Sequence, residues 1–327
     1  MIEAKYYSKL DDKRTICELC PKGCIIQDKE TGFCKAFLNN NGTLYNTLYE
    51  KASSISMDPI EKKPLFHFYP GSKILSIGSI GCNLRCQFCQ NWQLIEGNAP
   101  LDSVTSGDLL TLSINNNSIG IAFTYNEPII SYEFVLDTFR LFKMNNLKTV
   151  LVTNGFINEK PLIELLEYTD ALNIDLKSME DSFYNNICMG KIEPVKRTIS
   201  LAGERSFIEV TNLVIPGLND TELNFRLISE FLSNINNNIP LHFSRYFPCY
   251  KLNISPTPVS TLISAYNIAR EKLKYVYISN ASVESMENSK CPVCSNLLIK
   301  REGYLSKVTG IIDNKCSLCD SLVNFII

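Results

Sequence analysis

The chain has 327 residues, of which 45% are hydrophobic, and a formal net charge of −2. This length suits one large domain with smaller appendages. The balanced charge excludes the strongly basic surface of nucleic-acid-binding proteins, so we expect no nucleic-acid partner. No apolar signal-peptide core opens the chain, and no run reaches the ~18 apolar residues of a membrane span. We therefore expect a cytoplasmic protein that does not contact a membrane.

Residues 1–70 form a loop-rich segment that contains four of the thirteen cysteines. Cys17, Cys20, Cys24 and Cys34 follow the spacing C-x2-C-x3-C-x9-C. In a reducing compartment, clustered cysteines favour metal binding over disulfides. Four thiolates this close predict a closed auxiliary metal site. Because thiolates suit both zinc and iron–sulfur clusters, the spacing leaves the metal open.

A second cysteine group contains only three thiols, which lie within the stretch SIGCNLRCQFCQNW. Cys82, Cys86 and Cys89 follow the spacing C-x3-C-x2-C. Three thiolates on a four-iron cluster leave one iron open to an outside ligand. Gly81 permits a close backbone approach before the first cysteine, and Phe88 supplies an apolar wall. The alternative is a zinc loop whose fourth ligand comes from afar, with His67, Cys188 and Cys249 as candidates.

Six short apolar runs alternate with amphipathic stretches in the middle of the chain. This alternation predicts an α/β fold with a mostly parallel sheet. The residues alone do not distinguish an open doubly wound sheet from a partial barrel. The expected strands lie at residues 73–81, 119–125, 148–154, 171–177, 207–217 and 240–248.

Polar residues stand at the ends of the expected strands. They are Asn126 and Glu127 after the second strand, Asn154 after the third, and Asp175 and Lys177 at the fourth. The carboxyl ends of parallel strands meet on one face, where α/β enzymes bind their ligands. Turn chemistry is an equal alternative for Asn154, but it explains little for Glu127 and Lys177.

The last segment, residues 283–327, holds two C-x2-C pairs. Cys291 and Cys294 form the first pair, and Cys316 and Cys319 the second. This spacing is typical of a zinc ribbon or a rubredoxin-like module. We expect a metal to stabilise a tail that is too small to build its own core.

The three-cysteine motif also resembles a known family. C-x3-C-x-aromatic-C is the signature of radical S-adenosylmethionine (SAM) enzymes, and GCNLRCQFCQNW matches it without a gap. CELCPKGCII, FTYNEP, NIDLK and EVTNLVIPGLND resemble AmmeMemoRadiSam system radical SAM enzymes, which are relatives of the pyruvate formate-lyase activating enzymes. The resemblance implies a partial (β/α)6 TIM-like barrel over residues 71–282, between the segments 1–70 and 283–327.

Carried over residue by residue, the resemblance implies two cofactors. Cys82, Cys86 and Cys89 would ligate a [4Fe–4S] cluster, whose open iron binds SAM. The family's Gly-Gly-Glu segment is Tyr-Asn-Glu here, so Glu127 is the firm match to the residue that holds the SAM amino group. The implied SAM contacts are Phe88, Asn126, Glu127, Thr153, Asn154, Asp175 and Lys177.

The resemblance also implies a reaction and its partners. Reductive cleavage of SAM would yield a 5′-deoxyadenosyl radical that abstracts hydrogen from a substrate, with electrons from a flavodoxin-like or ferredoxin-like donor. Two substrate classes remain open: a glycyl radical protein, as for the activating enzymes, or a molecule associated with Memo-type and AMMECR-type proteins. The alternative hypothesis is a protein of a different functional class, a zinc-stabilised adaptor or binding protein in which every cysteine group is structural.

Overall fold

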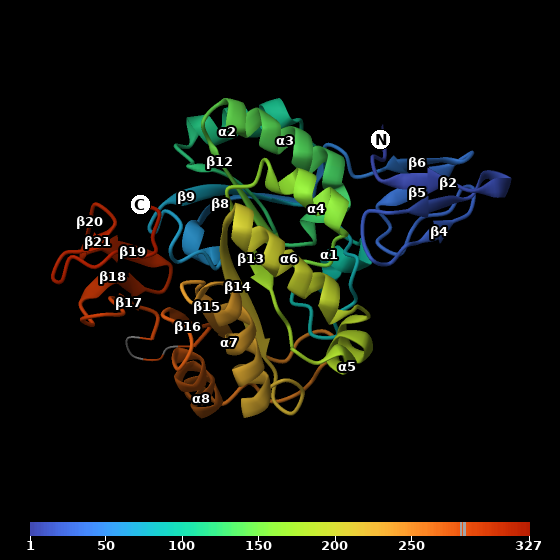
Figure 1. Ribbon diagram of the computed structural model, residues 1–327. Helices are drawn as coiled ribbons and strands as arrows, with labels where there is room; N and C mark the ends of the chain where they lie inside the picture. The colour runs from blue at the N-terminus through green and yellow to red at the C-terminus, as the bar shows by residue number, and fades with distance from the viewer. Residues whose placement is uncertain (282, 284–285) are drawn as a thin grey trace.

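The computed structural model describes residues 1–281, 283 and 286–327. Its centre is an eight-stranded sheet with the strand order β16-β15-β14-β13-β12-β11-β9-β8 (Figure 1). Adjacent strands from β9 to β16 pair in parallel, and β8 pairs antiparallel with β9. The strands are β8 (Ser54–Pro59), β9 (Lys73–Gly78), β11 (Gly120–Phe123), β12 (Lys148–Thr153), β13 (Ala171–Asp175), β14 (Phe207–Val214), β15 (Leu241–Arg245) and β16 (Val276–Ser279).

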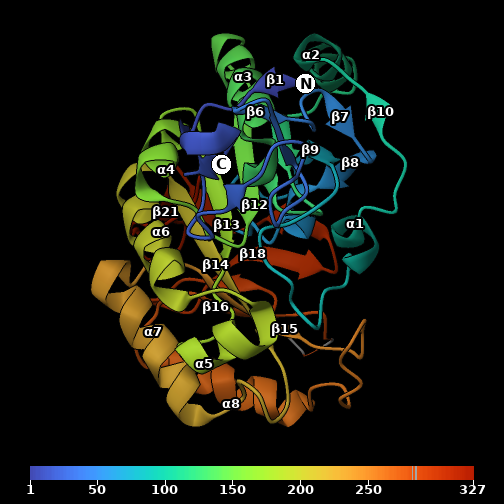
Figure 2. The same ribbon diagram turned by 90° about the vertical axis from the view of Figure 1, so that its right-hand side faces the viewer.

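Helices between the parallel strands follow one another along the outer side of the curved sheet (Figure 2). Within the described residues the sheet stays open, with β8 and β16 as its edges. The predicted partial-barrel fold class is therefore confirmed, and β16 adds a strand to the six expected. The helices are α1 (Trp92–Glu96), α2 (Ser106–Asn115), α3 (Tyr132–Met144), α4 (Glu159–Leu166), α5 (Asp181–Phe183), α6 (Ile192–Arg205), α7 (Glu222–Asn236) and α8 (Val259–Arg270).

Local sequence explains why these elements form where they do. Every residue of β11 is buried, as expected of a parallel strand covered on both faces. Thr105 and Asp108 form a capping box at the start of α2, and Thr221 caps α7. Pro161 and Pro194 lie in the first turns of α4 and α6, where a missing N–H costs nothing.

The N-terminal segment folds into two small three-stranded sheets that pack on the barrel. Their buried residues, Phe37 and Leu44 among them, belong to the same hydrophobic cluster as the barrel core. Strand β8 also lies within residues 1–70 but pairs with the central sheet. The short strands before the barrel are β1 (Ile2–Glu3), β2 (Tyr7–Lys9), β3 (Thr15–Cys17), β4 (Ile25–Ile26), β5 (Phe37–Asn40), β6 (Thr43–Asn46) and β7 (Lys51–Ala52), the last pairing with β10 (Asp102–Ser103).

The C-terminal strands lie on the opposite side of the sheet from the N-terminal ones (Figure 1). The sequence predicted that the barrel ends at residue 282 and the C-terminal module begins at residue 283. Residue 282 lies outside the described residues. Across the part of the chain that is described, no helix is both long and apolar enough to cross a bilayer. The C-terminal strands are β17 (Ser289–Lys290), β18 (Leu297–Glu302), β19 (Leu305–Val308), β20 (Ile311–Ile312) and β21 (Lys315–Cys316).

A buried polar network joins the C-terminal strands to the barrel. The His67 ring stacks on Phe325 with centroids 3.8 Å apart, and its Nε2 lies 2.6 Å from the Tyr277 hydroxyl. The fully buried His242 lies 2.6 Å from a carboxylate oxygen of Glu209. Both histidines are therefore part of the packing between barrel and tail.

Candidate active site

A cavity of about 590 Å³ opens among the carboxyl ends of the strands. This volume is typical of a pocket for a small ligand. The sequence predicted ten cluster and SAM contacts, and the structure brings all of them to the lining of this one cavity. They are Cys82, Cys86, Phe88, Cys89, Asn126, Glu127, Thr153, Asn154, Asp175 and Lys177.

The three cysteines lie on the loop between β9 and α1. Burial, followed by the nearby Glu127 carboxylate, raises the pKa of the Cys82 thiol well above its usual range. Burial likewise raises the pKa of Cys89 to about 11. Buried thiols without a partner resist ionisation, whereas bound metal deprotonates them outright. The loop is therefore suited to hold thiolates once a metal provides positive charge.

Two asparagine side chains fix the first cysteine of the loop. The Nδ2 of Asn154 lies 3.5 Å from Sγ of Cys82 and 2.9 Å from Oδ1 of Asn83. Asn83 in turn donates to the carbonyl of Phe156 at 2.7 Å. Asn154 thus does more than end a strand, because its amide ties the β12 end to the cysteine loop.

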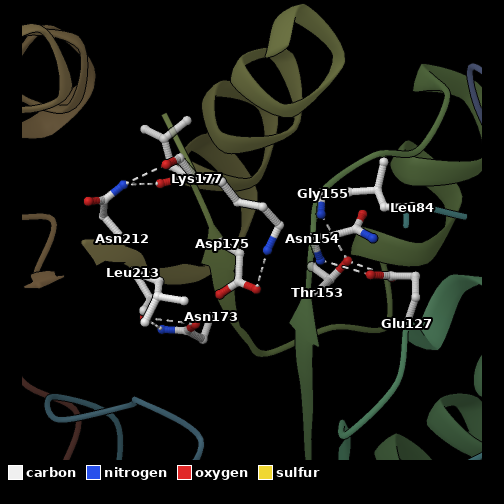
Figure 3. Close-up of polar contacts among 12 residues, drawn as sticks. Leu84, Glu127, Thr153, Asn154, Gly155, Asn173, Asp175, Lys177, Asn212 and Leu213 are labelled. Atoms are coloured by element: carbon white, nitrogen blue, oxygen red, sulfur yellow. Dashed lines mark hydrogen bonds and ion pairs between the residues drawn. The ribbon is translucent and has the colours of Figure 1, made fainter. Parts of the chain in front are cut away.

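Glu127 is a buried carboxylate that faces neutral donors only (Figure 3). Its Oε1 accepts a hydrogen bond from Oγ1 of Thr153 at 2.7 Å, and its Oε2 accepts one from the backbone N–H of Asn154 at 2.8 Å. Burial nevertheless raises the pKa of Glu127 to about 7. Among the described residues it has no ion-pair partner, so the site is suited to a ligand that brings N–H groups or positive charge.

Lys177 and Asp175 form an ion pair at the end of β13 (Figure 3). Burial alone would lower the pKa of Lys177, but the Asp175 carboxylate and the Cys86 thiolate outweigh it and hold that pKa well above its usual range. The backbone carbonyl of Lys177 accepts hydrogen bonds from Asn212 and Asn219. The ammonium is therefore charged and held in place at the cavity wall.

Asn126 lines the cavity, but its side chain is already occupied. Its Oδ1 accepts a hydrogen bond from the backbone N–H of Ser79 at 2.9 Å, and its Nδ2 donates to the carbonyls of Ile80 and Gly81. The residue therefore holds the start of the cysteine loop against the end of β11. A contact of its side chain with SAM stays a prediction.

The two cysteines outside the groups lie close to the loop but not in the cavity. A hydrogen bond with the Cys188 side chain lowers the pKa of Cys86. The Cys249 thiol donates to the carbonyl of Cys89 at 3.6 Å. Among the described residues, the only thiols that line the cavity are the three of the loop. His67, the remaining candidate for a fourth ligand, lies in the polar network with the C-terminal strands.

The chain's similarity to known proteins agrees with this geometry. Residues 76–226 match the family model described as "Radical SAM superfamily". A stretch of 180 residues is 30% identical to pyruvate formate-lyase 1-activating enzyme of Escherichia coli (strain K12), covering 51% of this chain and 71% of that protein. The chain belongs to the radical SAM superfamily. An uncharacterized protein of Methanocaldococcus jannaschii is 41% identical over 100% of both chains.

Among solved structures, a similar fold occurs in the radical SAM neighbour SuiB of Streptococcus suis bound to S-adenosylmethionine. The TM-score is 0.50 at 13% identity, and the match covers 64% of this chain and 52% of that one. At this identity the likeness concerns the fold alone. The narrower resemblance to AmmeMemoRadiSam enzymes stays a prediction.

Radical SAM proteins use a [4Fe–4S] cluster and SAM, and the residues of the cavity fit both. Three half-buried thiols supply three ligands and leave the fourth position of a cluster to another molecule. Glu127 has no cationic partner within the described part of the chain, and Lys177 offers an ammonium to a carboxylate. The Asp175 side chain is 40% exposed, so one of its oxygens remains free for a hydroxyl group.

The sequence did not predict three further residues that line this radical SAM cavity. Thr211 faces the cavity from the middle of β14, where the alternation of its strand could have marked it as inward-facing. Lys62 comes from the segment after β8, and Tyr304 from the turn between β18 and β19. No local pattern marks these two residues, because they reach the cavity only through the packing of the flanking segments.

Proposed function

We propose that this chain is a radical SAM enzyme that binds its cluster through Cys82, Cys86 and Cys89 and cleaves SAM reductively. The proposal rests on one observation: the three thiols share a cavity with a buried carboxylate and a fixed ammonium. When bound, the cluster and SAM supply a 5′-deoxyadenosyl radical, which abstracts a hydrogen atom from the substrate. The protein contributes binding, orientation and the exclusion of water.

Each polar side chain has a partner in the chemistry of SAM. Glu127 would accept N–H bonds from the amino group, since its carboxylate lies among neutral donors. The Lys177 ammonium would bind the carboxylate, and Asp175 a ribose hydroxyl. The buried Phe88 ring, 5.7 Å from Nζ of Lys177, would keep water from the ammonium. These contacts would orient SAM without moving the backbone.

The test is anaerobic reconstitution with iron and sulfide, followed by reduction with dithionite in the presence of SAM. We expect a brown protein that yields equal amounts of 5′-deoxyadenosine and methionine by mass spectrometry. Cys89→Ala should abolish both products. A colourless wild-type protein that binds only zinc and forms no 5′-deoxyadenosine would contradict the proposal and favour the zinc-stabilised adaptor.

Two matched variants separate an open cluster from a closed zinc loop. Cys188→Ala and Cys249→Ala each remove a thiol next to the loop but outside the cavity. If either thiol were a fourth ligand, its loss would release the metal. We expect both variants to retain the loop's iron as measured by metal analysis.

For the substrate, we favour a glycyl residue of a partner protein over a small molecule. The supporting observation is the 30% identity to pyruvate formate-lyase 1-activating enzyme across half of this chain. Incubation with candidate partner proteins, Memo-type and AMMECR-type proteins included, should produce a persistent glycyl radical by electron paramagnetic resonance (EPR) on one of them. Deuterium transfer into 5′-deoxyadenosine from a small molecule, with no protein radical, would exclude the activase reading.

A further inference from the structure

Four N-terminal cysteines surround one enclosed, largely apolar space. Cys17, Cys20, Cys24 and Cys34 all line it. The remaining wall is mostly aliphatic and aromatic and includes Leu19, Ile26, Phe37, Ile129 and Ile130. Cys17 is buried and the other three cysteines are half-buried. Four thiols that converge on one largely apolar space offer four ligands to a single metal centre.

The separation of the sulfur atoms differs between the cysteine groups of this chain. Zn–S bonds of about 2.3 Å in a tetrahedron place the sulfurs about 3.8 Å apart. The C-terminal set fits this value, since Cys291 and Cys319, and likewise Cys294 and Cys316, have their sulfurs 3.6 Å apart. Among the described residues, it is the only group whose ligand atoms all lie within 4.8 Å of one another.

The N-terminal set and the loop triad are both more widely spaced than the C-terminal set. A four-iron cube binds each thiolate through a different iron, so its ligands stand further apart than those of one zinc ion. The triad belongs to a superfamily that uses such a cube. The N-terminal set is therefore more widely spaced than the ligands of one zinc ion, as a cube requires, while the C-terminal set has the spacing of a zinc site.

We propose that Cys17, Cys20, Cys24 and Cys34 bind a second [4Fe–4S] cluster, which carries single electrons to the site at Cys82. The carrier role rests on the proposed function, whereas the cluster itself does not. An external low-potential carrier protein, of the ferredoxin or flavodoxin class, would donate one electron to this cluster. The cluster would pass that electron on and return to its oxidised state, with no bond made or broken.

One residue touches both sites. Asn83 lines the N-terminal space together with Cys20. Its Oδ1 lies 3.9 Å from Sγ of Cys82, the first ligand of the other site. The Asn83 side chain therefore lies between the N-terminal space and the first ligand of the loop, so the two sites are adjacent.

The backbones of the two sites also press against each other. A Cβ atom at Gly81 would lie 2.5 Å from the carbonyl oxygen of Cys34. Cations surround the same region: Lys22 and Arg85 both lie over the Phe33 ring, at 4.2 and 4.3 Å from its centroid. These positive charges would offset the negative charge of a cluster with four thiolates.

The first test removes the loop triad from the full-length chain. After anaerobic reconstitution, the wild type should hold about eight irons and the triple variant Cys82→Ala, Cys86→Ala, Cys89→Ala about four. The variant should keep the Mössbauer and EPR signature of a four-iron cluster, and both proteins should hold one zinc. A triple variant with two zinc ions and no iron would overturn the proposal.

A measurement on the wild type tests the proposal even if the triple variant misfolds. SAM binds only where an iron is open, so its addition should shift about half of the EPR intensity of the reduced protein. A shift of the whole signal would mean a single cluster and would overturn the proposal. If the triple variant keeps its iron but the wild type never cleaves SAM, the second cluster is supported and the proposed function is contradicted.

The carrier role has its own readout. In Cys24→Ser, the ratio of SAM cleavage driven by reduced flavodoxin to cleavage driven by dithionite should fall at least tenfold, since small dithionite reaches the loop cluster directly. Cys319→Ser, in the zinc set, is the matched control and should leave the ratio unchanged. An unchanged ratio in Cys24→Ser would exclude electron transfer through this site.

Discussion

The ammonium of Lys177 lies 2.9 Å from Oδ2 of Asp175, two residues earlier at the end of β13. The pair is asymmetric, because the lysine side chain is 11% exposed and the aspartate side chain 40%. The aspartate therefore faces solvent, whereas the lysine side chain is largely buried in the cavity wall. Asp175 keeps Lys177 charged and aimed at the cavity before any ligand arrives.

Lys177→Met should weaken SAM binding by about 1.5–3 kcal/mol, which corresponds to about 10-fold to 150-fold in Kd, because it removes a hydrogen bond to a charged group. Isothermal titration of the reconstituted, unreduced protein measures this. Lys196→Met is the control, since Lys196 pairs with Glu193 on the surface. Equal affinities of the two variants would exclude Lys177 from the SAM site.

Glu127 should make the stability of the cluster-free chain depend on pH. Its pKa of about 7 in the folded chain exceeds the ordinary value of 4.5, so between these pH values the folded state holds a proton that the unfolded state has lost. The free energy of unfolding should therefore fall as pH rises through this window, by about 3 kcal/mol. Urea denaturation at several pH values measures the slope.

The isosteric variant Glu127→Gln should remove this slope, because an amide does not titrate. Glu222→Gln, on the exposed first turn of α7, should leave it as in the wild type. If Glu127→Gln kept the wild-type slope, another group would cause the pH dependence of stability. Glu127 would then not be a buried carboxylate with a raised pKa.

Sequence patterns predicted the parts of the site that local chemistry encodes. Three thiols in eight positions have few uses besides a metal, and Glu127 and Lys177 follow buried strands where turn chemistry does not require them. Because parallel strands align their carboxyl ends, such residues converge whatever the details of packing. The partial barrel followed instead from the resemblance to radical SAM enzymes, because the strand pattern alone left an open sheet equally possible.

The connections between segments were beyond the reach of local patterns. Asn83 has no sequence feature that sets it apart from other loop residues. It lines the N-terminal space only because the N-terminal sheets pack against the cysteine loop. Tyr304 reaches the cavity from a hairpin more than two hundred residues after the triad. Such contacts depend on tertiary packing, which neither periodicity nor motif spacing records.

Gly81→Ala should disrupt the cysteine loop. Gly81 has φ +82°, and an added Cβ would lie 2.5 Å from the carbonyl oxygen of Cys34, a backbone atom that cannot move aside cheaply. We expect iron loading to fall by more than half, because the added methyl group would push the loop before Cys82 away from the backbone of Cys34. Metal analysis after reconstitution measures this.

Gly97→Ala is the matched control for this variant. Gly97 has nearly the same φ, +81°, but its added Cβ would meet only the Ile80 side chain at 3.8 Å. It should cost about 1–2 kcal/mol of backbone strain and leave iron loading near the wild-type value. Equal iron loss in both variants would mean that backbone strain, and not the close approach to Cys34, determines the effect.

The C-terminal set should bind one zinc ion that stabilises the tail. Its sulfurs already stand at tetrahedral spacing, and Cys291 and Cys316 are part of a small buried cluster with Leu298 and Ile299. Cys316→Ser should lower the zinc content and speed amide exchange in β18 about 100-fold, because metal binding supplies folding energy that this short segment lacks. Leu318→Ala, at a side chain 70% exposed beside the site, is the control. Slow exchange in β18 that survives the loss of zinc would show that packing against Phe66 and Tyr277 of the barrel holds the tail without metal.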